Sequence, residues 1–328
     1  MDLWKERIMR ILHLEPYNYS KEKLSSLRKD CFLQEENFKI QEELQLHLKN
    51  YQYDVIFTRL GLSLDKQILS LQRELKYVVT PTTGLNHIDL NYCNDNKIKV
   101  VSLKGEIEFL TTVKSTAEHT WALLLTLIRN IPVAFQQVKN DIWERHQLMA
   151  DELDGKTIGI IGYGRLGKII ARYAKAFDMS VLVNDTREIE DEVKEGEKNV
   201  SLEVLLRNSD IICLMITYEE RNINFLDYSK IQMMKDQVIL INTSRGEMVN
   251  EDALIQALKS KKISGVATDV LKNDSIWNGK LPIVPEIIKY AKKNDNVIIT
   301  PHMGGYGKVS IKKTRDFITD KFLNQIEK

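Results

Sequence analysis

Short apolar runs alternate with amphipathic stretches along most of the chain, and this alternation predicts the fold class. In the first part, β-rich apolar runs predict strands at residues 10–14, 54–58, 76–80 and 98–102. The stretch 65–75, between the second and third runs, has the spacing of an amphipathic helix. Because strands that alternate with helices usually pair in parallel, this part predicts an α/β unit with a parallel sheet.

A long apolar helix predicted at 117–129 separates this part from a second alternating series. The second series predicts strands at residues 157–161, 180–184, 211–216, 238–242, 264–270 and 296–300. Helical stretches such as 166–177 and 250–259 lie between most of them. Six strands with crossovers is the count of a doubly wound dinucleotide-binding sheet. A last helical stretch, 304–328, has no strand of its own, so it could finish the second unit or return to the first.

A glycine-rich turn, Gly162-Tyr163-Gly164-Arg165-Leu166-Gly167, follows the first strand of the second series. A GxGxxG pattern alone is weak evidence, but this one lies between a strand and an amphipathic helix, as phosphate-binding loops do. Gly162 permits the tight turn, Gly164 lets the backbone approach a pyrophosphate, and Gly167 lets the helix pack closely on the strand. The start of the helix offers free N–H groups to the phosphates. We therefore assign Gly162, Gly164, Arg165, Leu166 and Gly167 to a dinucleotide site.

The choice between NAD and NADP is indicated by Asp185, which ends the next strand and lies 23 residues after Gly162. A carboxylate at this distance can accept hydrogen bonds from the adenosine ribose and would repel a 2′-phosphate. NAD is therefore favoured over NADP, although Arg187 weakens that preference slightly. The alternative interpretation is that Asp185 is a plain turn residue.

Candidate catalytic residues follow three of the predicted strands. The strand 238–242 runs into Thr243-Ser244-Arg245-Gly246, the next runs into Asp269, and the last runs into Pro301-His302. Because ligands bind outside the carboxyl ends of parallel strands, these residues should meet at one sheet edge. Arg245 suits a planar carboxylate, and His302 suits proton transfer to a forming alkoxide. A single histidine at a strand end is usually structural, but Arg245 and the phosphate loop on the same sheet favour catalysis.

Composition narrows the class of protein. The 328 residues favour two domains, and 47 Lys and Arg against 46 Asp and Glu leave a net charge of +1. That balance suggests neither a nucleic-acid nor a membrane partner. Three scattered cysteines fit a reducing cytoplasm, and no residue cluster has metal-ligand spacing, so no metal is expected. Residues 1–7 do not resemble a signal peptide, and the apolar stretch 121–128 is too short to cross a bilayer; we interpret it as a buried helix that could also pack against a second subunit.

Several segments together resemble the D-isomer-specific 2-hydroxyacid dehydrogenases, the group that includes D-3-phosphoglycerate dehydrogenase. The similarity runs from about residue 76 to residue 305, and more loosely to the N-terminus. The segments that carry it are Gly84-Leu85-Asn86-His87-Ile88-Asp89, Ser115-Thr116-Ala117-Glu118-His119, Gly159-Ile160-Ile161-Gly162-Tyr163-Gly164-Arg165-Leu166-Gly167, Leu240-Ile241-Asn242-Thr243-Ser244-Arg245-Gly246 and Thr300-Pro301-His302-Met303-Gly304-Gly305.

The resemblance implies a Rossmann domain inserted into a flavodoxin-like substrate domain, which accounts for a phosphate loop that begins only after about 150 residues. The substrate domain would comprise 1–116 plus 303–328, and the NAD-binding domain 117–302. The substrate would lie in the cleft between them. A homodimer is implied, with the helix 117–129 near the two-fold axis, and the small-molecule partner is a 2-hydroxy or 2-keto acid of D configuration.

Carried over onto this chain, Arg245 binds the carboxylate and carbonyl of the substrate, and His302 is the acid and base. Asp269 would contact the nicotinamide amide, and Thr217 and Thr243 would line the cofactor site. In the first domain, the backbone of Thr82, Thr83 and Gly84 resembles the carboxylate-binding loop of the family. Arg59 falls where the phosphoglycerate branch has an arginine for a distal phosphate, with a solvated surface arginine as the equal alternative.

The chain departs from the family pattern at three places. Where the family has a third catalytic residue, a glutamate, this chain has Asp274, so either the backbone moves closer or water bridges to His302. The segment between Asp269 and His302 is longer than usual, and Glu286 within it could replace the glutamate. The usual His and Pro after the strand at 211–216 are Met215 and Thr217. We therefore expect a divergent branch that acts on a larger 2-hydroxy acid, phosphorylated or sugar-derived, rather than on plain phosphoglycerate.

Two other function classes remain for comparison. The first is an NADH-binding regulator with little or no turnover, which only the change at Asp274 supports. The second is a short-chain dehydrogenase or nucleotide-sugar epimerase, which needs a Tyr-x-x-x-Lys pair well after the phosphate loop. Pairs with this spacing, such as Tyr17 and Lys21, lie far upstream of it, so this second class is rejected.

Overall fold

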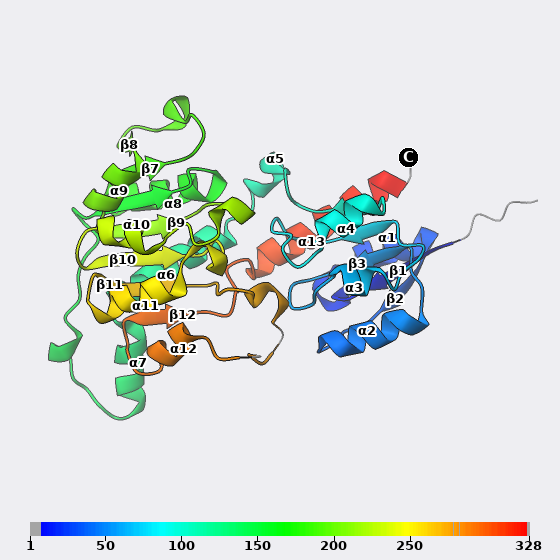
Figure 1. The fold of residues 1–328 in the computed structure, drawn as a ribbon, viewed down its shortest axis with the longest axis horizontal. Helices are drawn as coiled ribbons and strands as arrows, with labels where there is room; N and C mark the ends of the chain where they lie inside the picture. Colours follow the sequence, from blue (N-terminus) through cyan, green and yellow to red (C-terminus); the bar gives the residue numbers. More distant parts are fainter. Residues whose placement is uncertain (1–7, 278, 282, 327–328) are drawn as a thin grey trace, which may run out of the picture. The chain divides into compact units, whose positions relative to one another are not determined.

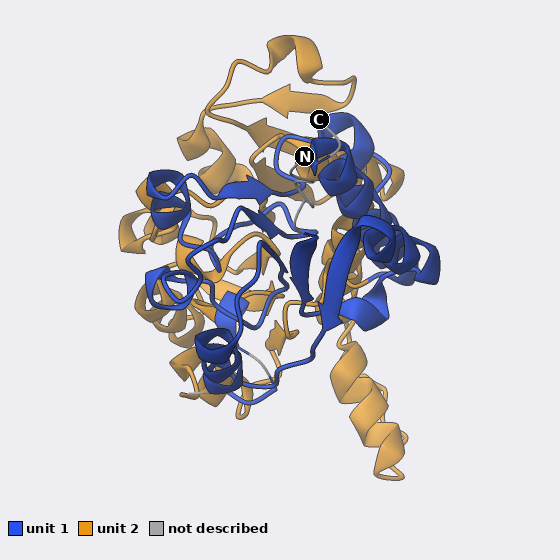
Figure 2. Ribbon diagram, turned by 90° about the vertical axis from the view of Figure 1, so that its right-hand side faces the viewer, with its two compact units in different colours: residues 1–113, 275–282, 307–328 blue, residues 114–274, 283–306 orange. Residues whose placement is uncertain are grey.

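The computed structural model describes residues 8–277, 279–281 and 283–326, which form two compact units (Figure 2). Unit 1 comprises 1–113, 275–282 and 307–328, and unit 2 comprises 114–274 and 283–306. The short segment 275–282 groups with unit 1, which no motif had indicated. Residues 1–7, where we expected no signal peptide, lie outside the described residues. No helix in the described ranges is long and apolar enough to cross a membrane.

Unit 1 is built on a parallel sheet with the strand order β2-β1-β3-β4-β5. Its strands are β1 (Met9–His13), β2 (Cys31–Glu35), β3 (Val55–Phe57), β4 (Tyr77–Val79) and β5 (Lys99–Val101). This is the order of flavodoxin-like sheets, so the predicted fold class is confirmed for this unit. The apolar pattern does not show β2, because it is an edge strand in which Phe32 and Glu35 are exposed and only Cys31 is buried.

The helices of unit 1 are α1 (Lys21–Asp30), α2 (Gln41–Asn50), α3 (Lys66–Leu69), α4 (Leu90–Asp95), α5 (Ile107–Leu110) and α13 (Lys308–Ile326). The helix predicted at 65–75 is wrong beyond Leu69, where the chain turns to bring Gln72 against the backbone of Leu48 and Tyr51. The C-terminal helix α13 returns to this unit, as Figure 1 shows. Its Phe322 is fully buried.

Unit 2 holds the second sheet, all parallel, in the order β12-β11-β10-β9-β6-β7-β8. Its strands are β6 (Thr157–Ile161), β7 (Ser180–Asn184), β8 (Glu197–Asn199), β9 (Ile211–Leu214), β10 (Val238–Asn242), β11 (Ile263–Thr268) and β12 (Val297–Ile299). The order reverses between β6 and β9, as it does in dinucleotide-binding sheets. Six strands were predicted; the seventh, β8, is a three-residue edge strand of polar residues that an apolar pattern cannot show.

Helices cover both faces of this sheet. They are α6 (Ser115–Ile128), α7 (Ile131–Lys139), α8 (Arg165–Ala176), α9 (Leu202–Asn208), α10 (Tyr228–Met233), α11 (Glu251–Lys259) and α12 (Glu286–Ala291). One core contains α6 and α8, with Leu124 and Ile170 packed under the strands. The other contains α9, α10 and α11, with Leu206 and Leu254. Burial on both faces explains why the strands of this unit read as continuous apolar runs.

The remaining elements are short 3-10 helices at Pro16–Asn18, His146–Leu148, Glu190–Glu192, Glu220–Asn222, Gly246–Met248 and Asp274–Ile276. The last of these begins in unit 2 and continues into unit 1. Within unit 1, the carbonyl of Ser275 accepts a hydrogen bond from the N–H of Gly61 at 2.8 Å, and its hydroxyl accepts one from Asn86 at 3.2 Å. These contacts explain why 275–282 groups with unit 1.

Candidate active site

The glycine-rich turn after β6 has the geometry of a phosphate cradle. Gly162 has a φ of +95°, and a Cβ there would lie 2.7 Å from the carbonyl oxygen of Met215. A Cβ at Gly167 would lie 2.3 Å from the carbonyl oxygen of Gly162, so the helix can pack this closely only with glycine. A Cβ at Gly164 would meet nothing within 4 Å, which leaves the approach to the backbone open. These are the features that a pyrophosphate needs.

The helix behind this turn is placed to bind an anion. Arg165 opens α8, and the N-cap residue of this helix, Gly164, supplies no side-chain cap. The N–H groups of Leu166 and Gly167 have no acceptor among the described residues, so they can bind an anion. Leu166 packs against the core under α6 and α8. The residues present therefore fit a dinucleotide at this position.

Tyr163, between the first two glycines, fastens the turn to the edge of the sheet. Its ring is buried, and its hydroxyl donates a short hydrogen bond to Glu197 on β8. Glu197 also pairs with Lys175 of α8 at 2.8 Å. Burial raises the pKa of the Tyr163 hydroxyl, and the Glu197 charge adds to this effect. The edge strand that the apolar pattern missed thus helps to shape the cofactor loop.

Asp185 follows β7 and is bonded to the same turn. One carboxylate oxygen accepts the N–H of Tyr163 at 2.8 Å, and the other accepts Arg187 through N at 3.0 Å and Nε at 3.2 Å. Burial alone would raise the pKa of Asp185, but the hydrogen bonds from Arg187 and Tyr163 outweigh it and hold this pKa below its usual range. The carboxylate is therefore ionised at neutral pH, and Arg187 partly neutralises it.

Three neighbouring strands deliver the candidate catalytic side chains to one edge. Asn242 of β10 pairs in register with Thr268 of β11, which pairs with Ile299 of β12. Arg245, Asp269 and His302 come one to three residues after these strand ends. β6 with its glycine-rich turn lies two places further along the same sheet. The structure thus brings these three side chains to the sheet edge that also carries the phosphate cradle.

His302 and Asp274 form a direct pair. His302 has a φ of +52°, and its Nδ1 lies 3.0 Å from Oδ1 of Asp274. The other oxygen of Asp274 accepts the N–H of Leu271 at 2.9 Å, which fixes the carboxylate. Glu286, the alternative partner, begins α12, is exposed and pairs with Lys289. The shorter side chain therefore reaches the imidazole without water, and Nε2 of His302 is left for proton transfer.

Arg245 carries a charge that no carboxylate neutralises by direct contact in the described ranges. Its Nη1 donates to the carbonyl of Ser244 at 2.7 Å, and its Nε is buried without a partner among the described residues. Burial lowers the pKa of this guanidinium, while the charges of Asp274 and Glu247 act in the opposite direction. A partly buried cation with spare donors beside the His302–Asp274 pair is suited to an incoming carboxylate.

Thr243 and Thr217, which are also predicted to line the cofactor site, lie in different environments: the first is buried and the second is exposed. The hydroxyl of Thr243 is buried and lies 2.7 Å from the hydroxyl of Thr120 on α6, so it joins the strand end to that helix. Thr217 is exposed beyond β9, and its carbonyl accepts a hydrogen bond from Asn222 at 3.0 Å. Any contact from Thr243 to a cofactor would therefore use its backbone.

His119 belongs to this site although the sequence analysis gave it no role. It lies in the second turn of α6, and its Nε2 is 3.2 Å from Oδ1 of Asp269 and 3.0 Å from the hydroxyl of Thr300. No strand ends at His119, so the pattern of polar residues after strands does not indicate it. Its place within the motif Ser115-Thr116-Ala117-Glu118-His119 was the available signal.

In unit 1, the loop after β4 presents backbone donors. The hydroxyl of Thr82 donates to the carbonyl of Gly84 at 2.8 Å, and the N–H groups of Thr83 and Gly84 have no acceptor among the described residues. Arg59, after β3, is buried rather than solvated: it donates to the carbonyl of Leu60 at 2.8 Å and of Phe38 at 2.9 Å. A distal phosphate could use Arg59 only by competing with those carbonyls.

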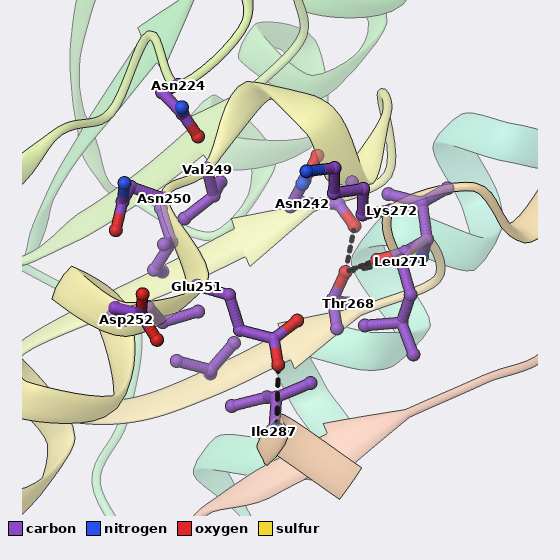
Figure 3. Close-up of a pocket in the computed structure, with 15 residues that line it drawn as sticks. Asn224, Asn242, Val249, Asn250, Glu251, Asp252, Thr268, Leu271, Lys272 and Ile287 are labelled. Carbon is purple, nitrogen blue, oxygen red and sulfur yellow. Dashed lines mark hydrogen bonds between the residues drawn. The ribbon is translucent and has the colours of Figure 1, made fainter. Parts of the chain in front are cut away.

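A cavity of about 190 Å³ lies beside the turn that carries Arg245 (Figure 3). Gly246, Leu271 and Lys272 line it, and the hydroxyl of Thr268 braces its wall by donating to the carbonyl of Asn242 at 3.1 Å. A Cβ at Gly246 would lie 2.0 Å from the carbonyl carbon of Leu271, so the turn and the wall are in tight contact. Neither Arg245 nor His302 lines this cavity, so it is not the place where they would meet a substrate.

In the described part of the chain, no group of three His, Cys, Asp or Glu side chains is arranged to hold a metal ion. Cys31, Cys93 and Cys213 are buried free thiols. Burial raises the pKa of Cys31 to about 11, of Cys93 to about 11 and of Cys213 to about 12. None of them is poised as a nucleophile.

Comparison with known proteins gives consistent results. Residues 121–304 match the family described as "D-isomer specific 2-hydroxyacid dehydrogenase, NAD binding domain". A Staphylococcus saprophyticus protein, whose name marks its 2-hydroxyacid dehydrogenase activity as inferred, is 37% identical over 255 residues, 76% of each chain. The crystal structure of a D-lactate dehydrogenase from Aquifex aeolicus, complexed with NAD and lactic acid, superposes with a TM-score of 0.81 at 30% identity and covers 97% of this chain and 95% of that one. An acyclic imino acid reductase in complex with NADPH and D-Arg superposes with a TM-score of 0.75 at 26% identity and covers 97% and 96%.

Proposed function

Because this chain belongs to the family of D-isomer-specific 2-hydroxyacid dehydrogenases, we propose that it interconverts a small D-2-hydroxy acid and its 2-keto acid with NAD(H). The observation that supports this best is the arrangement at the carboxyl edge of β10–β12. There, the guanidinium of Arg245, which contacts no carboxylate among the described residues, lies on the same edge as a histidine–aspartate pair, on the sheet that holds the phosphate cradle.

In this proposal Arg245 recognises the substrate. Its free guanidinium donors suit a bidentate contact with the carboxylate, and the same charge polarises the neighbouring carbonyl. As the carbonyl oxygen gains negative charge during reduction, the attraction to the guanidinium strengthens, so Arg245 stabilises the transition state more than the ground state. The N–H groups of Thr83 and Gly84 are further candidates for the carboxylate.

His302 acts as the general acid in reduction and the general base in oxidation. Nδ1 is committed to Asp274, so the proton that reaches the substrate oxygen leaves from Nε2. Asp274 fixes the ring orientation and stabilises the imidazolium, a positioning role like that of the aspartate in hydrolase triads. The turn from Gly162 to Gly167 would hold a nicotinamide dinucleotide, which would supply the hydride chemistry at the substrate carbon.

For the cofactor we propose NAD, with Asp185 as the ribose partner. The carboxylate would repel a 2′-phosphate, but its bonds to Arg187 must loosen before ribose hydroxyls can take their place. Arg187 could then pair with a 2′-phosphate, so the preference for NAD is expected to be moderate. Among the similar structures, one holds NAD and another holds NADPH.

The substrate side chain is less constrained. The sequence predicts a phosphorylated or sugar-derived acid on the basis of Arg59 and of the long segment after Asp269. Because the Nη atoms of Arg59 are engaged by carbonyls, we propose a substrate without a phosphate, such as a short aliphatic or a sugar-derived keto acid.

The test is a panel of 2-keto acids with NADH, followed by loss of cofactor absorbance. Glyoxylate, pyruvate, hydroxypyruvate, phosphohydroxypyruvate and a 2-keto sugar acid cover the alternatives, and the chirality of the product checks the D configuration. We expect turnover with at least one acid and a fall of roughly 10²- to 10⁴-fold for His302→Asn. NADH binding without turnover on any acid would instead favour the sensor class, whose one supporting feature, Asp274, is in direct contact with His302.

We also propose that the protein is a homodimer in the cytoplasm. The helix α7 has no buried residue, and Ile131, Phe135 and Val138 form an exposed apolar stripe along it. Figure 2 shows this helix projecting from the rest of unit 2. An exposed apolar stripe along a projecting helix is typical of a surface that a second copy of the chain covers. Sedimentation should show a dimer that Phe135→Glu converts to a monomer, while the exposed change Gln136→Glu, away from the stripe, leaves it intact.

A further inference from the structure

The carboxylate of Asp269 is the centre of a bonded cluster that the roles above do not use. It is buried at the end of β11. Oδ2 accepts the N–H of Gly304 at 2.7 Å, and Oδ1 accepts the N–H of Met303 at 2.9 Å and the hydroxyl of Thr300 at 2.5 Å. Oδ1 also lies 3.2 Å from Nε2 of His119. Three of these four donors belong to the turn that carries His302.

That turn is folded around Asp269 by its backbone as well. The N–H of His302 donates to the carbonyl of Asp269 at 2.8 Å, and His302 holds a left-handed φ of +52°. Such a conformation is unfavourable for a residue with a side chain and persists only when its surroundings enforce it. A Cβ at Gly304 would lie 2.9 Å from Oδ2, so the turn closes directly on the carboxylate. The direction of the His302 side chain therefore depends on Asp269.

The first turns of α6 hold Asp269 in place from the other side. Because the hydroxyl of Thr300 donates to Asp269, its lone pair is free to accept the N–H of His119 at 3.0 Å. His119 Nε2 is then the protonated nitrogen and bridges Thr300 and Asp269. One turn earlier, the hydroxyl of Ser115 donates to the carbonyl of Gly304 at 2.7 Å. The helix thus contacts the His302 turn at both of its ends.

We propose that His119 is a positioning residue for the reaction: it holds Asp269 and, through Asp269, sets the direction of the His302 imidazole. His302 is then oriented from two sides, by Asp274 at its ring and by the His119–Asp269 bond at its backbone. Oδ2 of Asp269 keeps one lone pair for a nicotinamide amide, so the positioning role adds to a cofactor contact rather than excluding it. This inference rests on the proposed role of His302.

The test compares three single substitutions. His119→Leu removes the donor, His119→Gln keeps an amide N–H at the position of Nε2, and Glu118→Gln changes an exposed neighbour on the same helix. Because a displacement of about 1 Å can cost 10²-fold in rate, we expect kcat to fall about 10- to 100-fold for His119→Leu, with NADH affinity within about twofold. His119→Gln should recover most of that loss, and Glu118→Gln should match the wild type.

A double-mutant cycle with His302→Asn separates this role from a merely structural one. If His119 acts through His302, adding His119→Leu to His302→Asn should lower the residual rate no further. Losses that multiply, or a lower melting temperature with unchanged kcat, would overturn the proposal.

A readout without substrate keeps this inference apart from the proposed activity. The imidazole carbon resonance of His302, identified by its absence in His302→Asn, should shift or broaden in His119→Leu and stay unchanged in Glu118→Gln. An unmoved resonance in His119→Leu contradicts the positioning role whether or not the enzyme turns over. Absence of turnover in the wild type, with the expected change in resonance, would instead contradict the proposed function alone.

Discussion

Oδ1 of Asp274 lies 3.0 Å from Nδ1 of His302, a direct hydrogen bond made by a side chain one methylene shorter than the glutamate of the family. The backbone places Asp274 close enough to His302 to compensate for its shorter side chain. Asp274 begins a short 3-10 turn, and its second oxygen accepts the N–H of Leu271. The carboxylate is thus held by its own loop, and the histidine does not need a longer partner.

The first prediction concerns this pair. Asp274→Asn keeps the shape but loses the charge that stabilises the imidazolium, so we expect kcat to fall by roughly 10²-fold while NADH affinity is unchanged. Asp274→Glu restores the family residue and should stay within about tenfold of the wild type. Steady-state kinetics with the best keto acid of the panel measures both. Full activity in Asp274→Asn would show that His302 needs no ionised partner.

The second prediction concerns Arg245. Arg245→Ala should lower kcat/KM by about 10³-fold or more, because one guanidinium binds the carboxylate and polarises the carbonyl. Arg245→Lys keeps the charge but loses the planar fork, so it should recover only part of the rate. NADH titration by fluorescence should give the wild-type affinity in both. Arg207→Ala, on the surface of α9, is the matched control, and equal losses there would point to a general charge effect.

The third prediction concerns cofactor choice. In Asp185→Ala, Arg187 loses its partner and can pair with a 2′-phosphate, so the ratio of kcat/KM for NADPH to that for NADH should rise about 10- to 100-fold. Adding Arg187→Ala should cancel most of this gain. Parallel kinetics with the two cofactors measures the ratio, and an unaltered value in Asp185→Ala would place cofactor choice elsewhere.

The fourth prediction concerns His13 and the stability of unit 1. His13 is fully buried between Tyr19 and Phe57, its Nε2 has no partner in the described ranges, and burial, aided by the charge of Arg315, lowers its pKa to about 3. Below about pH 6.5 the unfolded chain binds a proton at this histidine while the folded one does not. The free energy of unfolding should therefore fall by about 1.4 kcal/mol per pH unit as pH drops from about 6.5 towards 3.

Urea unfolding at pH 7.5 and 5.0 measures this effect. The loss of stability between the two pH values should be about 2 kcal/mol smaller in His13→Gln than in the wild type, whatever the absolute stability of the variant. His146→Gln, on an exposed 3-10 turn, should leave the difference unchanged. An equal pH dependence in His13→Gln and the wild type would mean that His13 titrates alike in both states.

The sequence predicted the strands of unit 2 well for a physical reason. Strands β6, β7 and β10 are covered on both faces, so each reads as an unbroken apolar run with sharp ends. The edge strands β2 and β8 are partly exposed to solvent, so they contain no continuous apolar run. The apolar pattern therefore did not predict either of them. The helix at 65–75 was overextended, because the apolar spacing continues past Leu69 although the backbone turns there.

Parts of the candidate site depend on contacts that no local pattern contains. His119 and Asp269 are 150 residues apart, and their bond appears only when α6 is laid against the ends of β11 and β12. The sequence does not decide whether Asp274 or Glu286 contacts His302, because the reach of each side chain depends on how its loop is folded. Likewise, the burial of Arg59 depends on the carbonyl of Phe38, which lies in another loop.

The return of α13 to unit 1 also determines the order in which the protein can fold. Phe322 packs on Phe57 and Tyr77, and Arg315 pairs with Glu15 at 2.7 Å across 300 residues of chain. During synthesis, the first 113 residues therefore leave the ribosome with part of their core uncovered. Unit 2, which lies almost entirely between them and α13, can fold first. A chain that is cut before α13 would lack the helix that closes unit 1, and it should aggregate rather than persist as a shortened enzyme.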